Sequence, residues 1–204
     1  MNKSATYFDY CFDEEKVRAA LQDFAARLLT VPQRVRIMLA QAGALELEHQ
    51  DYVDERIGRV RISARTVFSS DRFLFHKTTN RRLYNDELHA ARNAGCDDAL
   101  FFNENAELTE GAVHNVFVVK EGIWRTPPIS CGLLPGTCRA QILREQSNAH
   151  EAIVTLDDLL HADAIYLCNI AFGDLPGCTF TRGVLGRPSP NRAGHDLVAR
   201  PIFS

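Results

Sequence analysis

Lys77 is a lysine whose surroundings could make it a nucleophile. It directly follows the apolar run Phe73-Leu74-Phe75 and precedes the polar run Thr78-Thr79-Asn80. A lysine where a strand meets a loop is partly desolvated, and desolvation lowers the pKa of an amine toward the range in which it is nucleophilic. A solvated surface lysine is the alternative interpretation, so this segment alone identifies only a candidate.

Glu110 is a second candidate, in the stretch from Glu107 to Asn115. Gly111 follows it directly, and a carboxylate can point inward where the backbone turns sharply at a glycine. A capped or solvated acid in a turn is the alternative interpretation of the same residues.

The run from Gly132 to Arg139 contains a third candidate, a glycine-containing turn that opens a helix. Pro135-Gly136-Thr137 stands at the expected helix start, where free backbone N–H groups and the helix dipole favour an anion such as phosphate. Many helices begin in this way, so the signal becomes specific only together with the other two.

The charge and hydropathy of the chain argue against two classes of partner. The 204 residues carry 23 Lys and Arg against 26 Asp and Glu, a net charge of -3, which leaves no basic excess for a nucleic acid or an anionic membrane. No stretch reaches the roughly 20 apolar residues of a spanning helix, and the N-terminus has no apolar signal region. We expect a cytoplasmic protein that binds neither nucleic acid nor membrane.

The cysteines are expected to be reduced, and no metal site is expected. The spacing of Cys131 and Cys138 offers no CxxC or HxxxH ligand pair, and the cysteine density is too low for a disulfide scaffold. The six cysteines are Cys11, Cys96, Cys131, Cys138, Cys168 and Cys178.

Residues 1–66 are predicted to form a small α+β domain. Asp13 can cap a helix that buries one apolar stripe as far as about Leu28 and ends at Pro32. Alternation of polar and apolar residues predicts strands over 34–39, 45–48 and 59–63. Residues 67–72 are expected to be the linker to a second domain.

Residues 73–204 are predicted to form a larger, strand-rich domain that carries Lys77. Helices are expected over 80–94, from 137 to about 146, and after the capping pattern Thr155-x-x-Asp158. Strands are expected over 99–102, 115–119, 123–125 and 164–168, with a hairpin turn at Glu121-Gly122. Residues 186–204 are expected to be a loosely held tail.

Taken together, the lysine, the glutamate and the helix start resemble the fold-type IV pyridoxal-phosphate enzymes, the class IV aminotransferase family. Their order and spacing carry the resemblance, with Glu110 in the pattern Thr-Glu-Gly-x-x-x-Asn. The resemblance implies a two-domain fold that mixes α+β and α/β elements, with pyridoxal 5′-phosphate as cofactor, a small-molecule amino substrate and a homodimer.

The resemblance also implies roles for individual residues. Lys77 would carry the cofactor as a Schiff base, and Glu110 would keep the pyridine nitrogen protonated. The phosphate would be held at the helix start by Gly136, Thr137 and Cys138. Further cofactor contacts are expected from Tyr84 and Asn169, and substrate contacts from His76, Arg81 and Asn115.

Within the family, three segments are similar to those of lyases that convert 4-amino-4-deoxychorismate to 4-aminobenzoate and pyruvate for folate synthesis. They are His-Lys-Thr-Thr-x-Arg-x-x-Tyr from His76 to Tyr84, the opening from Ser4 to Asp13, and Leu167-Cys168-Asn169. An aminotransferase acting on branched-chain or D-amino acids is the nearest alternative. A catalytically silent family member that binds the cofactor weakly or not at all is a further one.

The start of the chain departs from the family pattern. Family members begin well before the Ser-Ala pair that stands here as Ser4-Ala5, with an early strand pair and a helix whose arginine binds the phosphate. We therefore expect the start of the first domain, and that arginine, to be missing.

Overall fold

The computed structural model describes residues 1–28, 31–52, 59–175, 178–185 and 196–198. The chain divides into two compact units, Met1–Glu55 and Arg56–Ser204. Among the described residues, no helix is both long enough and apolar enough to span a membrane.

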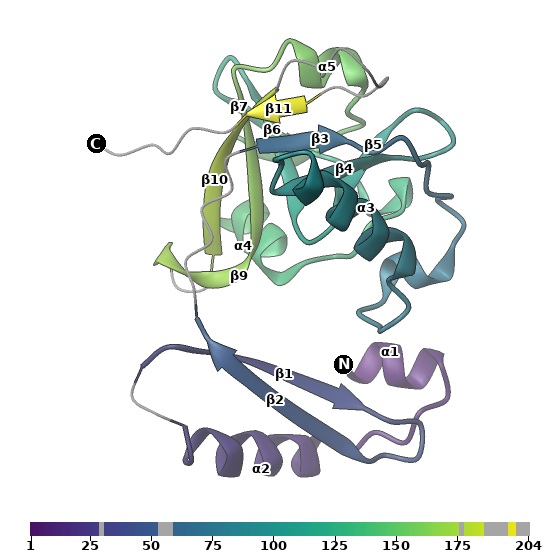
Figure 1. Cartoon of the computed structure of the whole chain (residues 1–204), viewed down its shortest axis with the longest axis vertical. Coiled ribbons are helices and arrows are strands. Elements are labelled where there is room, and N and C mark those ends of the chain that lie inside the picture. The colour runs from purple at the N-terminus through teal and green to yellow at the C-terminus, as the bar shows by residue number, and fades with distance from the viewer. Residues whose placement is uncertain (29–30, 53–58, 176–177, 186–195, 199–204) are drawn as a thin grey trace. The chain divides into compact units, whose positions relative to one another are not determined.

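The first unit contains two helices and a two-stranded sheet (Figure 1). Helix α1 spans Asn2–Tyr7, α2 spans Glu14–Ala25, and strands β1 (Gln33–Leu39) and β2 (Leu45–Asp51) pair antiparallel. Asp13 caps α2 as predicted, because its side chain accepts a hydrogen bond from the backbone N–H of Lys16. The expected buried stripe is wrong, since no residue of α2 is buried within the described chain.

The second unit is built on a nine-stranded sheet in the order β5-β4-β3-β11-β10-β9-β6-β7-β8. Its strands are β3 (Arg59–Ile62), β4 (Asp98–Phe102), β5 (Leu108–Gly111), β6 (Asn115–Lys120), β7 (Ile123–Thr126), β8 (Ala149–Glu151), β9 (Ala164–Leu175), β10 (Cys178–Leu185) and β11 (Asp196–Val198). Its helices are α3 (Arg82–Asn93), α4 (Thr137–Glu145) and α5 (Leu156–Leu160), with 3-10 turns η1 (Arg72–Phe75) and η2 (Ile129–Cys131). The predicted elements are thus present, most with ends shifted by one or two residues.

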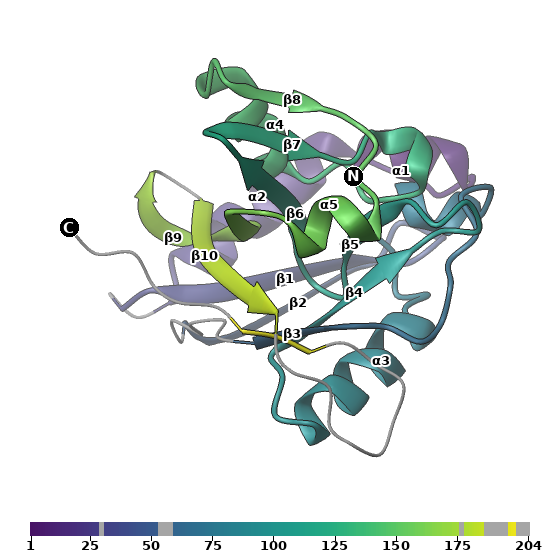
Figure 2. The ribbon, with the colours of Figure 1, turned by 90° about the horizontal axis from the view of Figure 1, so that it is seen from above.

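Side chains alternate between the two faces of this sheet and create separate cores. Along β4, Leu100 packs into an inner cluster with β3, β5, β6, β9 and α5, while Phe101 packs outward against α3. Along β6, Val116 and Val118 face the inner cluster, and Phe117 packs against α4. Viewed from above, α3 and α4 lie on the outer side of the strands and α5 lies near the interior that β4 and β6 share (Figure 2).

Two short signals in the second unit are confirmed in detail. Glu121 and Gly122 both have positive φ, 52° and 76°, as the tight turn between β6 and β7 requires. Thr155 and Asp158 form a complete capping box at the start of α5.

The boundary between the units differs from the expected linker at 67–72. Strand β3, expected in the first domain, pairs in parallel with β4 in the second unit, Val60 opposite Asp98. Val67 is 2% exposed in the core that α3 covers, and it forms a bridge with Asn103. Because long-range strand pairing holds this segment, it belongs to the second unit, and the division falls between Glu55 and Arg56.

The expected tail at 186–204 lies mostly outside the described residues. Within it, Asp196–Val198 form β11, which pairs antiparallel with β3. This short stretch of the expected tail is therefore a strand of the sheet.

Candidate functional site

Glu110 is the centre of a buried polar cluster in the second unit. It is 8% exposed and is the last residue but one of β5. Its Oε1 accepts a hydrogen bond from the Tyr84 hydroxyl at 3.2 Å, and its Oε2 accepts bonds from Asn115 Nδ2 and the Leu134 backbone N–H, each at 3.2 Å. A residue five positions away and two segments more than twenty residues away therefore converge on one carboxyl group.

A β-bulge contributes to the direction in which Glu110 points. Strands β4 and β5 pair at Leu100↔Gly111 and at Phe102↔Leu108, so two steps along β4 oppose three along β5. An extra residue in one strand breaks the ladder and redirects a side chain. Glu110 lies in this interval, and it lines a pocket rather than packing into the inner core.

Gly111 is needed for a different reason from the one expected. A Cβ at this position would lie 2.5 Å from Oδ2 of Asp98, so a larger residue would force the Asp98 carboxylate to move. The requirement is therefore the close approach of a neighbouring carboxylate, and not the sharp turn that the sequence suggested.

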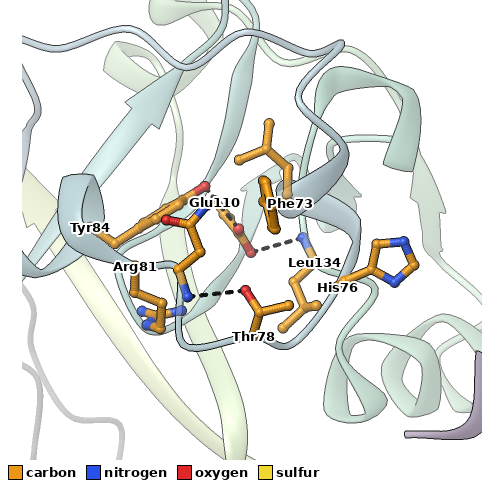
Figure 3. Close-up of a pocket in the computed structure, with 9 residues that line it drawn as sticks. Phe73, His76, Thr78, Arg81, Tyr84, Glu110 and Leu134 are labelled. Carbon is orange, nitrogen blue, oxygen red and sulfur yellow. Dashed lines mark hydrogen bonds between the residues drawn. The ribbon is translucent and has the colours of Figure 1, made fainter. Parts of the chain in front are cut away.

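The pocket beside Glu110 is formed by the loop before α3, the start of α3 and the segment before α4 (Figure 3). Arg81 donates a hydrogen bond to the backbone carbonyl of Ala112 and lies over the Tyr84 ring, with Cζ 5.3 Å from the ring centroid. The His76 ring points away from Glu110 in Figure 3. The lining residues are Phe73, Leu74, His76, Thr78, Asn80, Arg81, Tyr84, Glu110 and Leu134.

Burial changes the acid–base properties of the two central groups. Burial raises the pKa of Glu110 to about 8, against the opposing effects of its hydrogen bonds and of the positive charges on Arg81 and Lys77. Burial, together with the nearby charge of Glu110, raises the pKa of Tyr84 well above its ordinary value. Glu110 can therefore hold or release a proton close to neutral pH.

Lys77 lies next to this pocket and is itself exposed. Its neighbours His76 and Thr78 line the pocket, and its charge is near enough to lower the pKa of Glu110. The expected strand before it is wrong, since the preceding residues form the 3-10 turn η1. Asp71 caps that turn by accepting the Phe73 N–H at 2.9 Å, which bends the chain.

The helix start at Gly136 is tied to Glu110 through Asn115. Besides its bond to Glu110, Asn115 Nδ2 donates to the Leu134 carbonyl at 2.9 Å. A Cβ on Gly136 would overlap the Asn115 Oδ1, so any other residue there would displace the Asn115 side chain. The acid and the N-terminus of α4 are thereby held as neighbours in one network.

The remaining predicted residues have different surroundings. Thr137 begins α4 and is exposed, and Gly136 provides no side-chain cap for the helix. The Cys138 side chain packs into the core with Phe117, so only its backbone can face a ligand. Asn169 lies in β9 next to Cys168, which pairs with Asn115, and it is not among the pocket-lining residues.

Two contributors were missed by the sequence interpretation. The backbone N–H of Leu134 is a direct donor to Glu110, and a backbone contact leaves no signal in residue type. Asp98, fully buried, approaches Gly111. Gly111 indicated that another group approaches the backbone closely, but the sequence did not identify Asp98 as that group.

The residues present fit a cofactor that carries a basic ring nitrogen and a phosphate. Glu110 offers a proton-exchanging acid, and α4 offers an N-terminus without a side-chain cap or an acidic first turn. An exposed amine, Lys77, stands beside them. This donor set brings an acid, the N-terminus of a helix and an amine into one region.

Comparison with known proteins agrees with this chemistry. A family described as amino-transferase class IV matches residues 1–178. A Schizosaccharomyces pombe protein provisionally named an aminodeoxychorismate lyase is 29% identical over 164 residues, 76% of this chain and 68% of that protein.

Solved structures show the same fold. A Mesorhizobium loti protein provisionally described as an amino-acid aminotransferase is 31% identical, with a TM-score of 0.76, over 88% of this chain and 86% of that one. A hypothetical aminotransferase from Mycobacterium tuberculosis, solved in a PLP-bound form, is 17% identical with a TM-score of 0.67, over 82% and 68% of the two chains. Pyridoxal phosphate is the cofactor that these relatives indicate, and the chain belongs to the class IV aminotransferase family.

Proposed function

We propose that this protein is a pyridoxal-phosphate-dependent lyase that converts 4-amino-4-deoxychorismate to 4-aminobenzoate and pyruvate. The observation that carries the proposal is the buried Glu110, with a pKa of about 8, lining a pocket beside the exposed amine of Lys77. The similarity to the S. pombe protein, which extends over three quarters of this chain, supports the lyase reaction within the family.

Each residue of the site has a role in this proposal. Lys77 would hold the cofactor through its amine, and the same amine beside the pocket would move protons on the substrate. Glu110 would hold a proton at the ring nitrogen, and the backbone from Gly136 to Cys138 would hold the phosphate. When bound, pyridoxal phosphate supplies an electron sink conjugated to the substrate nitrogen.

The polar residues around Glu110 orient the reacting groups. Asn115 holds Glu110 and the segment before α4 in a fixed relation, since it contacts both. The Tyr84 hydroxyl donates a hydrogen bond to Glu110, and the Arg81 guanidinium lies over the Tyr84 ring. Arg81 would present positive charge to a substrate carboxylate, and His76, which lines the pocket, and Asn169 would add further contacts.

Transamination is the second candidate. The M. loti relative, which is 31% identical and has a TM-score of 0.76, is described as an amino-acid aminotransferase. Both reactions use the same lysine and the same electron sink, so the substrate and the products distinguish them.

The test begins with the purified full chain and added pyridoxal phosphate. A visible absorption band is expected, and Lys77→Ala abolishes it, whereas the matched exposed-lysine variant Lys120→Ala retains it. Absence of the band from the unaltered protein would contradict the proposal.

Product analysis then separates the two reactions. Release of 4-aminobenzoate and pyruvate in equal amounts from 4-amino-4-deoxychorismate identifies the lyase. Formation of a keto acid from an amino acid, without 4-aminobenzoate, identifies the transaminase instead.

A further inference from the structure

A buried carboxylate outside the pocket, that of Asp98, holds the chain that follows Glu110. Asp98, the first residue of β4, is 0% exposed. Its Oδ1 accepts hydrogen bonds from the backbone N–H of Ala112 at 2.9 Å and of Ala99 at 2.8 Å. Its Oδ2 lies 2.7 Å from Nδ1 of His114.

This contact lies close to an interruption in the regular strand pairing. The bulge between Leu108 and Gly111 interrupts the ladder of β4 and β5 around Glu110, and a bulge leaves its extra residue without a ladder partner. The backbone after the bulge therefore depends on contacts outside the ladder. Asp98 provides two of them, one to Ala112 and one to His114.

The backbone of Ala112 connects Asp98 to the pocket. Its N–H donates to Asp98 and to the carbonyl of Ala99, and its own carbonyl accepts a hydrogen bond from Arg81. Arg81 in turn lies over Tyr84, the donor to Glu110. A shift of the Ala112 backbone would thus move both Glu110, which precedes it in the chain, and Arg81, which is bonded to its carbonyl.

We propose that Asp98 is a positioning residue, whose buried carboxylate fixes the chain after the bulge and thereby orients Glu110 and Arg81 toward the same pocket. The inference rests on the proposed cofactor site, because orientation matters only if Glu110 meets a ligand. Asp98 is not among the residues that line the pocket, and its link to the pocket runs through Ala112 and His114.

The decisive variant is Asp98→Ala, measured by NMR titration of the Glu110 carboxyl carbon in the cofactor-free full chain. Loss of the carboxylate frees the chain after Glu110, so Glu110 becomes better solvated. We expect its pKa to fall by about one unit or more from about 8 toward its ordinary value of 4.5. Pyridoxal phosphate should bind about tenfold more weakly, the effect of one lost buried hydrogen bond.

Asp98→Asn separates orientation from simple loss of stability. The asparagine Oδ1 can still accept the Ala112 N–H, so this variant should restore the Glu110 titration to near that of the unaltered protein. If Asp98→Asn instead behaves like Asp98→Ala, the bond to Ala112 is not the means of positioning, and the inference is wrong.

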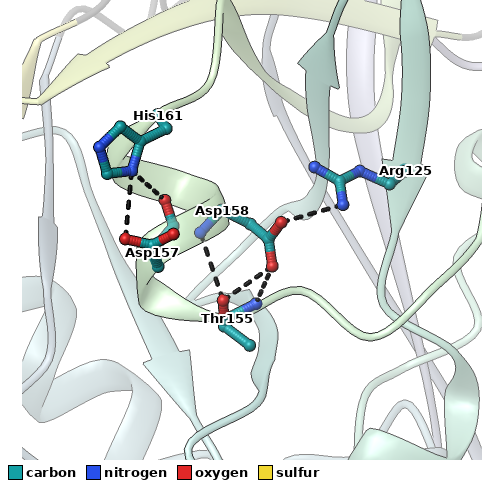
Figure 4. A network of polar contacts seen from close by, with 5 residues as sticks. All are labelled: Arg125, Thr155, Asp157, Asp158 and His161. Carbon is teal, nitrogen blue, oxygen red and sulfur yellow. Dashed lines mark hydrogen bonds and ion pairs between the residues drawn. The ribbon is translucent and has the colours of Figure 1, made fainter.

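Asp158 supplies a matched control, because it is also an aspartate that accepts a backbone N–H and contacts a basic side chain. It accepts bonds from the Thr155 N–H at 2.9 Å and from Arg125 at 2.9 Å (Figure 4). Asp158→Ala should lower the thermal midpoint while leaving the Glu110 pKa and cofactor affinity unchanged. Equal effects of Asp98→Ala and Asp158→Ala on Glu110 would overturn the inference.

A second variant covers the case in which Asp98→Ala does not fold. His114→Phe keeps a ring of similar size but removes the donor to Asp98, so a smaller fall in the Glu110 pKa is expected. An unchanged pKa in His114→Phe would then refute the inference. A missing visible band in the unaltered protein would refute the proposed function instead, because the NMR titration needs no cofactor.

Discussion

Two carboxyl groups in the second unit receive three hydrogen bonds each, yet their acidities move in opposite directions. Glu110 accepts bonds from Tyr84, Asn115 and the Leu134 N–H, and burial raises its pKa to about 8. Asp158 accepts bonds from the Thr155 N–H and hydroxyl and from Arg125, and those bonds hold its pKa below the ordinary value.

The difference lies in solvation and charge rather than in the number of hydrogen bonds. Glu110 is 8% exposed, and all three of its hydrogen-bond donors are neutral. The Asp158 side chain is 28% exposed and lies 2.9 Å from a guanidinium. Desolvation disfavours an ionised carboxyl group more than neutral donors favour it, so the pKa of the buried acid rises, whereas the partly exposed acid beside a guanidinium stays ionised.

The largest expected effect comes from Glu110→Gln in the cofactor-free protein. The folded-state pKa of about 8 exceeds the ordinary 4.5, so ionisation favours the unfolded chain between these two values. The unaltered protein should therefore lose roughly 3 kcal/mol of stability relative to the variant as pH rises from 5 to 8. Urea unfolding at several pH values measures this change in unfolding free energy. The same pH dependence in both proteins would show that Glu110 does not have a raised pKa.

Tyr84→Phe should have the next largest effect. It removes one of the three donors to Glu110, and because that hydrogen bond lowers the pKa of Glu110, the pKa should rise further. The loss of a buried hydrogen bond should cost about 1 kcal/mol of unfolding free energy. Tyr166→Phe, in a ring that stacks on Trp124 away from Glu110, is the control and should leave the Glu110 titration unchanged.

Asp158→Asn tests the other half of the comparison. The pKa of Asp158 is lowered in the folded protein, so its stabilising effect is present above the ordinary value of 3.8 and is lost as pH falls. The variant should lose about 1 kcal/mol near neutral pH, as expected for a helix cap, and should lose less stability than the unaltered protein on acidification. The measurement is the unfolding free energy at several pH values below 7, and a steeper fall for the variant than for the unaltered protein would contradict the prediction.

Lys77→Met should produce the smallest change in the Glu110 titration. The charge of Lys77 lowers the pKa of Glu110 less than the bonds from Leu134 and Tyr84 or the charge of Arg81 do, so removing it should raise that pKa only slightly. NMR titration of Glu110 measures the shift. A rise larger than that in Tyr84→Phe would show that charge, and not hydrogen bonding, dominates the response of this acid.

Local features were predictable because their contacts lie within a few residues. The Asp13 cap, the Glu121-Gly122 turn and the Thr155–Asp158 capping box each depend on atoms at most three residues apart. Most helix and strand positions in the second unit followed from hydrophobic periodicity for the same reason.

Features that depend on distant segments were predicted less well. The expected linker at 67–72 is part of the second unit, because β3 pairs with a strand about 38 residues further along the chain. Helix α2 has an apolar pattern but no buried residue among those described. Periodicity shows which face could be buried, and it does not show whether a partner covers it.

The sequence by itself determined which residues could form the site: a lysine after an apolar run, a glutamate before a glycine and a glycine at a helix start. Only the tertiary structure decided that Glu110 would be buried, that its pKa would be raised and which groups would donate hydrogen bonds to it. Tyr84, Asn115 and Leu134 reach Glu110 from positions 26, 5 and 24 residues away. The protonation of a carboxyl group depends on the water and charges around it, and those are set by packing between segments that no local pattern records.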